Sequence, residues 1–140
     1  MPVQRRKLID LHVGLKESLE VNIDVSDISR FADLSGDVSP LHIDKNFAIS
    51  RGFDGNVAHG AMIVAYTSAL IGNKLPGAYG ILQKMDIDFR APLIPPKKIV
   101  IEGEITNIST STGQITIKIR VIDSLKKMLA SGIAKSIVRE

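Results

Sequence analysis

The sequence predicts an α+β fold in which one antiparallel sheet wraps around a single long helix. Three observations point to this fold: four strand-like runs fill the C-terminal half, one apolar helix precedes them, and another strand comes before that helix. The chain has 140 residues, of which 44% are hydrophobic and 24% charged, as in ordinary globular proteins. This length suits one domain with one core, so we expect residues 1–140 to form a single domain.

The N-terminal third combines strand and helix signals. Residues 19–25 alternate between apolar and polar side chains, which predicts a half-buried strand. Residues 28–34 then carry apolar side chains at three-residue spacing, and Gly36 ends that pattern. We therefore expect a helix of about two turns there, capped by Ser26 or Asp27.

Two further helices are expected before the C-terminal strands. Asp44 can cap a short helix that runs through Ala48. Residues 57–71 are small or apolar on nearly every face, which predicts a long helix that is buried on most sides and ends at Gly72. This helix would occupy the centre of the domain.

The C-terminal half predicts four strands separated by turn residues. We expect them over residues 81–89, 98–105, 114–122 and 128–138. Short connections favour antiparallel pairing, and a sheet wrapped around one helix is the hot-dog architecture. A two-layer α+β sandwich of another topology is the alternative. Because a single sheet leaves its edges open, we expect a homodimer or a larger homo-oligomer.

Composition excludes several classes of function. The chain has no Cys, so disulfides, thiolate zinc sites and Cys nucleophiles are ruled out. The net charge of +3 comes from scattered basic residues, and there is no Trp, so we expect no nucleic-acid partner. No run of the sequence resembles an export signal or a membrane span, so we expect a soluble, cytoplasmic protein without a membrane partner.

The loop between the first two helices holds a candidate acid/base pair. Asp37 and His42 lie five residues apart, with a stiffening Ser-Pro step between them. An ordered loop can hold a carboxylate and an imidazole in position for proton transfer. The alternative is structural: Asp37 would be a turn residue after Gly36, and His42 would mark the entry to a helix.

A second candidate lies at the start of the long helix. Free N–H groups at a helix N-terminus favour negative charge, and Gly60 lets another group approach the backbone closely. Gly60 could equally serve close packing of the helix on the sheet. We interpret His59 as a structural hydrogen-bonding residue rather than as a base.

At these two points the sequence resembles the MaoC-like, (R)-specific enoyl-CoA hydratases. The residues that carry the resemblance run from Phe31 to Asp44, continue with Phe47-Ala48, and end with His59-Gly60. The family motif reads Asp, any residue, Asn, Pro, any residue, His, followed by His-Gly at the start of the central helix. The resemblance implies a hot-dog fold and hydration of a trans-2-enoyl thioester, or the reverse dehydration.

The resemblance also implies roles for individual residues. Asp37 and His42 would activate a water between them, and the Gly60 N–H would bind the thioester oxygen. Neither a metal nor another cofactor is required. The substrate would be an acyl-CoA or acyl-carrier-protein thioester, and Ser39, at the family's Asn position, offers one hydroxyl in place of an amide. We group the predicted substrate contacts as Ser39, His59, Val64, Ser68 and Ile71.

Other readings remain open at this point. Residues 57–72 contain no Asp or Glu, which argues against hot-dog thioesterases and dehydratases with a carboxylate on the central helix. A non-catalytic, acyl-binding hot-dog dimer is an alternative function. A metal site is another, because the chain offers ligands of suitable chemistry in Asp37, His42, Asp44 and His59.

Overall fold

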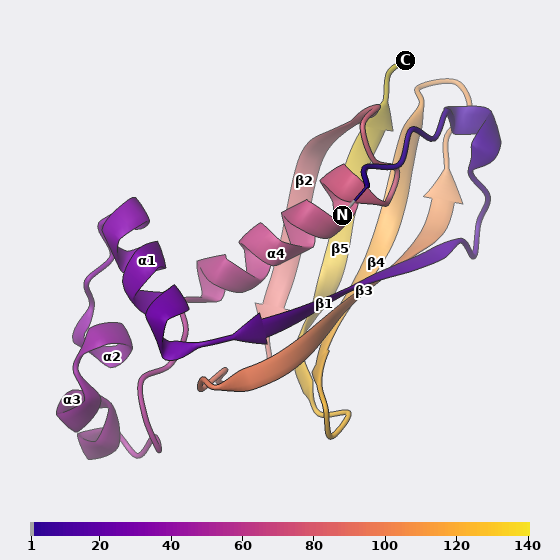
Figure 1. The fold of residues 1–140 in the computed structure, drawn as a ribbon. Coiled ribbons are helices and arrows are strands. Elements are labelled where there is room, and N and C mark those ends of the chain that lie inside the picture. The colour runs from indigo at the N-terminus through magenta and orange to yellow at the C-terminus, as the bar shows by residue number, and fades with distance from the viewer. Residues whose placement is uncertain (1) are drawn as a thin grey trace.

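A computed structural model describes residues 2–140 and has the predicted α+β architecture. One five-stranded antiparallel sheet carries the long helix across one of its faces (Figure 1). The strands are β1 (Lys16–Ile23), β2 (Gly80–Phe89), β3 (Lys97–Ile108), β4 (Gln114–Asp123) and β5 (Met128–Val138). The helices are η1 (Leu8–Asp10), α1 (Val25–Ser35), α2 (Pro40–Ile43), α3 (Lys45–Ser50) and α4 (Gly60–Asn73).

The strand order in the sheet is β1-β3-β4-β5-β2, so β1 and β2 form its two edges. Period-two alternation gives each inner strand a buried face; in β3, for example, Ile99, Ile101 and Ile105 are fully buried. Ile105 pairs with Ile117 of β4, so the isoleucines of neighbouring strands form one apolar layer. This layer lies beneath α4 and forms most of the core.

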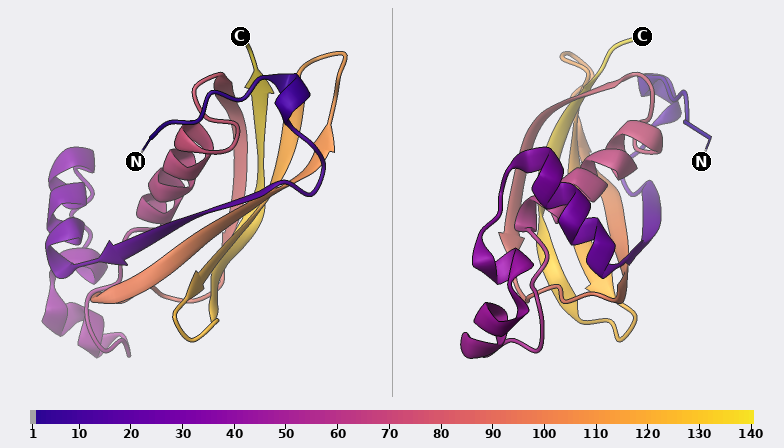
Figure 2. Two further views of the ribbon diagram at one scale, coloured as in Figure 1. Left: turned by 45° about the vertical axis from the view of Figure 1, so that its right-hand side comes forward. Right: turned by 60° about the vertical axis from the view of Figure 1, so that its left-hand side comes forward.

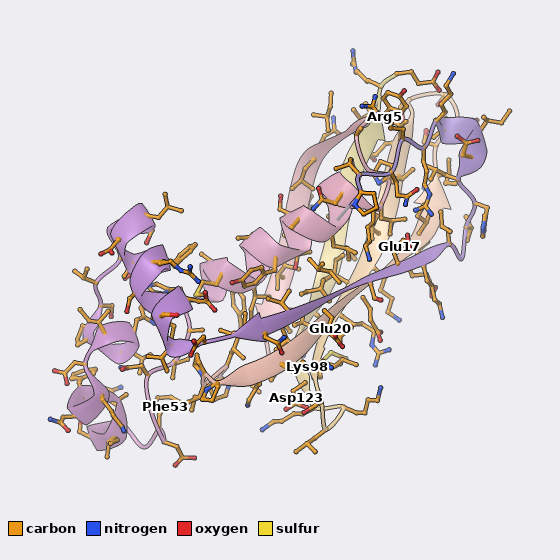
Figure 3. The ribbon with its side chains drawn as sticks, in the orientation of Figure 1. Arg5, Glu17, Glu20, Phe53, Lys98 and Asp123 are labelled. Carbon is orange, nitrogen blue, oxygen red and sulfur yellow. The ribbon has the colours of Figure 1, made fainter. Side chains whose placement is uncertain are left out.

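The opposite face of the sheet is charged and open to solvent. Glu20 and Lys98, labelled in Figure 3, form a cross-strand ion pair with 2.8 Å between their charged atoms. Arg120 and Glu102 form another at 3.3 Å. Exposed pairs of this kind contribute little to stability, so the α4 face of the sheet supplies the core.

The three short helices α1 to α3 lie together at one end of the sheet, beyond the start of α4 (Figure 2). Asp24 caps α1, so the predicted caps Ser26 and Asp27 were wrong. Asp27 instead occupies the third helical position of a capping box, where its carboxylate accepts a hydrogen bond from the Asp24 N–H. The predicted stop at Gly36 is confirmed: it adopts the left-handed conformation with φ of 78°.

The long helix differs from its prediction in two ways. It begins at Gly60 and not at residue 57, because residues 57–59 are extended and lead into the N-cap His59. It is also not covered on most sides within one protomer. Ala61, Ala65, Ser68 and Gly72 form an exposed stripe along it. No helix in residues 2–140 is long and apolar enough to span a membrane.

We predict that Asp27 makes the stability of the fold depend on acid pH. The hydrogen bond from the Asp24 N–H, followed by the one from the Arg30 guanidinium, lowers the pKa of Asp27 from its ordinary value of 3.8. The folded state therefore gains stability above that value, and the gain disappears as the pH falls through the folded pKa. The melting temperature of wild type should exceed that of Asp27→Asn at pH 7, and the difference should shrink as the pH falls below 3.8.

The matched control for this experiment is Asp33→Asn, which changes an exposed carboxylate on the same helix. Its difference from wild type should be small and should vary little with pH. A difference for Asp27→Asn that stays constant down to acid pH would contradict the role assigned to Asp27.

Candidate active site

Asp37 is held by the end of helix α1. The Ser35 hydroxyl donates to the Phe31 carbonyl at 2.7 Å and accepts from the Asp37 N–H at 3.1 Å. Beyond this turn the Asp37 carboxylate is half-exposed, and its Oδ1 accepts from the Ser39 N–H at 3.2 Å. The second carboxylate oxygen, Oδ2, faces His42.

His42 lies on α2, a one-turn helix that the sequence patterns did not predict. Its ring Nδ1 lies 2.7 Å from the Val57 carbonyl oxygen. A carbonyl can only accept, so Nδ1 carries a proton, and in the neutral imidazole Nε2 then presents a lone pair. The backbone next to His42 also bonds to Val57, because the Val57 N–H donates to the Leu41 carbonyl at 3.2 Å. These contacts orient the His42 ring, whose side chain is 15% exposed.

The gap between the two groups suits a shared water. Asp37 Oδ2 and His42 Nε2 are 3.8 Å apart, which is too far for a direct hydrogen bond. Each atom is an acceptor, so one water could donate a hydrogen bond to each of them. The structure therefore brings Asp37 and His42, the candidate pair that the sequence predicted, to a distance that one bridging water can span.

His59 lies behind this pair. Its ring stacks on the His42 ring, with centroids 3.9 Å apart and 24° between the planes, and its Nε2 lies 2.9 Å from the Asp37 carbonyl oxygen. Only 2% of its surface is exposed. The ring is therefore packed behind the loop and not presented to a substrate in one protomer.

Gly60 opens helix α4, and its N–H is one of the first-turn groups without an intrahelical partner. The N-cap His59 makes no side-chain cap there. The ring of Phe89 lies directly over Gly60: a Cβ added to Gly60 would be 2.9 Å from Phe89 Cζ. Any larger residue at position 60 would have to displace that ring, so glycine is also favoured there on steric grounds.

An apolar cavity of about 420 Å³ connects His42 with Gly60. Its walls include Phe53, Ile63, Phe89 and Leu93, which the sequence analysis did not select. Phe53, labelled in Figure 3, comes from the segment that follows α3. These residues come from four separate segments, so no local pattern marks them as neighbours.

The predicted substrate contacts on α4 do not line this cavity. Val64 is half-buried and Ser68 is exposed. Ile71 belongs to the hydrophobic core. Ser39 is exposed, and its backbone rather than its hydroxyl contacts Asp37.

The four residues of the metal-site alternative are only partly brought together. One potential ligand atom from each of Asp37, His42 and His59 lies within 4.8 Å of the others. Asp44 instead caps α3, as predicted, by accepting from the Phe47 N–H at 3.1 Å. The near-parallel stacking of the two imidazoles also prevents a single ion from lying in both ring planes, where their lone pairs point.

Comparison with known proteins agrees with this geometry. A profile of the MaoC like domain matches residues 10–126. The chain belongs to this family. The (R)-specific enoyl-CoA hydratase of Aeromonas caviae is 30% identical to this MaoC-like chain over 111 residues, which cover 79% of the chain and 83% of that enzyme.

A second relative of this MaoC-like chain is the 3-hydroxybutyryl-CoA dehydratase of Methylorubrum extorquens. It is 38% identical over 84 residues, or 60% of the chain. The match covers 54% of that dehydratase, so the chain spans about half the length of this relative.

Solved structures confirm the predicted hot-dog fold for the MaoC-like chain. The (R)-hydratase from Aeromonas caviae superposes with a TM-score of 0.87 and 27% identity, covering 92% of this chain and 98% of that one. An R-hydratase from Pseudomonas aeruginosa superposes with a TM-score of 0.92 and 28% identity, covering 99% and 88%.

Proposed function

We propose that this protein catalyses the (R)-specific hydration of trans-2-enoyl thioesters to (R)-3-hydroxyacyl thioesters, or the reverse dehydration. The observation that carries the proposal is the 3.8 Å gap between Asp37 Oδ2 and His42 Nε2, with His42 and Gly60 lining the same cavity. The names of the relatives, enoyl-CoA hydratase and 3-hydroxybutyryl-CoA dehydratase, support the same reaction class. We propose an acyl-CoA or acyl-carrier-protein thioester as substrate.

In the proposed first step, Asp37 takes a proton from the shared water while the water oxygen bonds to C3 of the substrate. The electron pair of the double bond moves onto the thioester oxygen and forms an enolate. The Gly60 N–H and the positive end of the α4 dipole stabilise that charge. Carbonyl polarisation is needed because C3 is electrophilic only when the thioester withdraws electrons.

In the second step, the proton passes from Asp37 to Nε2 of His42 and from there to the α carbon. The enolate electrons form the new C–H bond, and both side chains return to their starting forms. The Val57 carbonyl accepts from Nδ1–H of His42 at 2.7 Å and would stabilise the transient imidazolium. Dehydration follows the same path in reverse.

The direct test is hydration of crotonyl-CoA by the purified protein. We expect the absorbance of the conjugated enoyl thioester to fall, and chiral analysis of the product to give the (R)-3-hydroxyacyl thioester. A panel of longer enoyl-CoA substrates and one enoyl thioester on a carrier protein should accompany it. If no member of the panel is turned over, the hydratase proposal is wrong and the acyl-binding alternative gains support.

We also propose that two copies of the chain associate through β2. This strand is a sheet edge, and its side chains include Ile81 and Leu82, which are 52% and 39% exposed. Helix α4, which carries the exposed stripe, packs against β2. A second copy would cover both, and would place Val64 and Ser68 at a shared surface where they could contact the acyl chain.

For the association we predict that Ile81→Lys combined with Leu82→Lys produces a monomer. Charge on an edge strand opposes pairing, while these exposed positions tolerate Lys within the protomer. Light scattering after gel filtration measures the mass, and circular dichroism checks the fold. The control is Ser18→Lys combined with Glu20→Lys on the opposite edge, β1, which should leave the mass unchanged. A folded wild-type monomer at micromolar concentration would overturn the association.

A further inference from the structure

His59 connects the two halves of the candidate site. It is the N-cap of α4, so the residue that follows it is Gly60, the proposed oxyanion donor. Its side chain reaches 22 residues back along the chain to the backbone of Asp37, the proposed base. One residue therefore joins the base-carrying loop to the helix N-terminus.

The hydrogen bonds fix the tautomer of His59. The Asp37 carbonyl oxygen only accepts, so Nε2 of His59 donates across the 2.9 Å contact. The other ring nitrogen, Nδ1, is buried and has no hydrogen-bond partner among residues 2–140. A proton on Nδ1 would be a buried donor without an acceptor, which is unfavourable. The ring is therefore neutral with its proton on Nε2.

Two other rings pack against the same imidazole. Phe31 lies at a tilt to it, with centroids 4.9 Å apart, and His42 stacks on it at 3.9 Å. Phe31 belongs to α1, His42 to α2 and His59 to the start of α4. The ring thus packs against His42 while its N–H binds the Asp37 backbone.

We propose that His59 is a positioning residue: its neutral, Nε2-protonated imidazole holds Asp37 and His42 in register with the Gly60 N–H. It transfers no proton and contacts Asp37 only through that residue's carbonyl. This inference rests on the proposed hydratase function, which it deepens. Catalysis of this kind is sensitive to placement, since a shift of about 1 Å can cost about 10²-fold in rate.

Two substitutions separate the donor from the ring. In His59→Gln the amide N–H reaches close to the place of Nε2 and can still donate to the Asp37 carbonyl. In His59→Phe the ring stays and the donor is lost. We expect His59→Phe to lower kcat for crotonyl-CoA by about 10-fold to 10²-fold with little change in KM, and His59→Gln to recover most of that loss. The control is Phe31→Leu, which removes the Phe31 ring beside His59 but leaves the Nε2–H donor of His59 in place. Its kcat should stay within about 3-fold of wild type.

The tautomer of His59 can be tested without measuring enzyme activity. Nitrogen NMR of wild-type protein labelled at histidine should show His59 with a protonated Nε2 and an unprotonated Nδ1, and this result should not depend on substrate. It distinguishes the two proposals, because the absence of turnover in wild type would end the hydratase proposal, whereas a proton on Nδ1 would overturn the assignment of His59 whether or not crotonyl-CoA is turned over. It also keeps the inference testable if His59→Phe fails to fold.

Three results would overturn the inference. One is a folded His59→Phe variant with wild-type kcat. Another is a folded His59→Gln variant as slow as His59→Phe, which would indicate that the imidazole itself takes part in proton transfer. The third is an NMR spectrum with the proton on Nδ1.

Discussion

Substitution of either Asp37 or His42 is expected to remove nearly all hydratase activity while leaving the fold intact. Asn at position 37 keeps the oxygen that accepts from the Ser39 N–H at 3.2 Å but cannot take a proton from water. Ala at position 42 removes the imidazole that we propose to relay the proton, whose Nδ1–H donates to the Val57 carbonyl. General acid–base groups contribute about 10²-fold to 10⁴-fold, so kcat/KM for crotonyl-CoA should fall by that factor in each variant.

The Asp37 side chain is 51% exposed, so thermal unfolding of Asp37→Asn should remain near wild type. The His42 side chain is only 15% exposed and bonds to the Val57 carbonyl, so His42→Ala should unfold at a lower temperature, and circular dichroism should check its fold. The matched control is His12→Ala, which removes an exposed histidine outside the site and should keep full activity. A variant of Asp37 or His42 that retains wild-type kcat/KM would refute the role assigned to it.

Gly132→Ala is expected to be the most destabilising single-methyl change in the sheet. A Cβ at this position would run into the backbone of the edge strand β2: it would overlap the Asp86 carbonyl and lie 2.9 Å from Ile87 Cα. Backbone atoms cannot rotate away as a side chain can, so β2 must shift along its pairing with β5. We expect a loss of about 3 kcal/mol or more in the free energy of unfolding, measured by urea denaturation.

Gly55→Ala is the matched control for this change. It also adds one methyl at a buried glycine, but the nearest atom would be a side-chain carbon of Ile94 at an ordinary 3.4 Å. Its effect should be small. A Gly132→Ala protein with wild-type stability would mean that β2 does not pair closely with β5 around Asp86.

The fold could be predicted from the sequence because its strands are long and regular. The predicted strand over 128–138 matches β5 at both ends, and Gly36 ends α1 as expected. The boundaries that were wrong depend on the backbone. Asp24, and not the predicted Ser26 or Asp27, caps α1. Residues 57–59 stay outside the long helix because the Ala58 N–H donates to the distant Leu93 carbonyl.

The candidate site was predictable only where its residues are close in sequence. Asp37 and His42 share a loop and His59 and Gly60 are adjacent, so spacing could suggest both pairs. The two pairs are joined by a hydrogen bond from the His59 side chain to the Asp37 backbone carbonyl. Every residue has such a carbonyl, so the sequence does not reveal which one accepts the bond. The placement of Ser68 on an exposed stripe likewise depends on the tilt of α4 against the sheet.

The bond between the Ser39 N–H and Asp37 Oδ1 also bears on how such a site can change over time. Every residue except proline has a backbone N–H, so the orientation of the Asp37 carboxylate does not depend on the side chain at position 39. Ser can therefore stand where the family has Asn without releasing the base. Substitution at that position therefore need not disturb the carboxylate that we propose as the base.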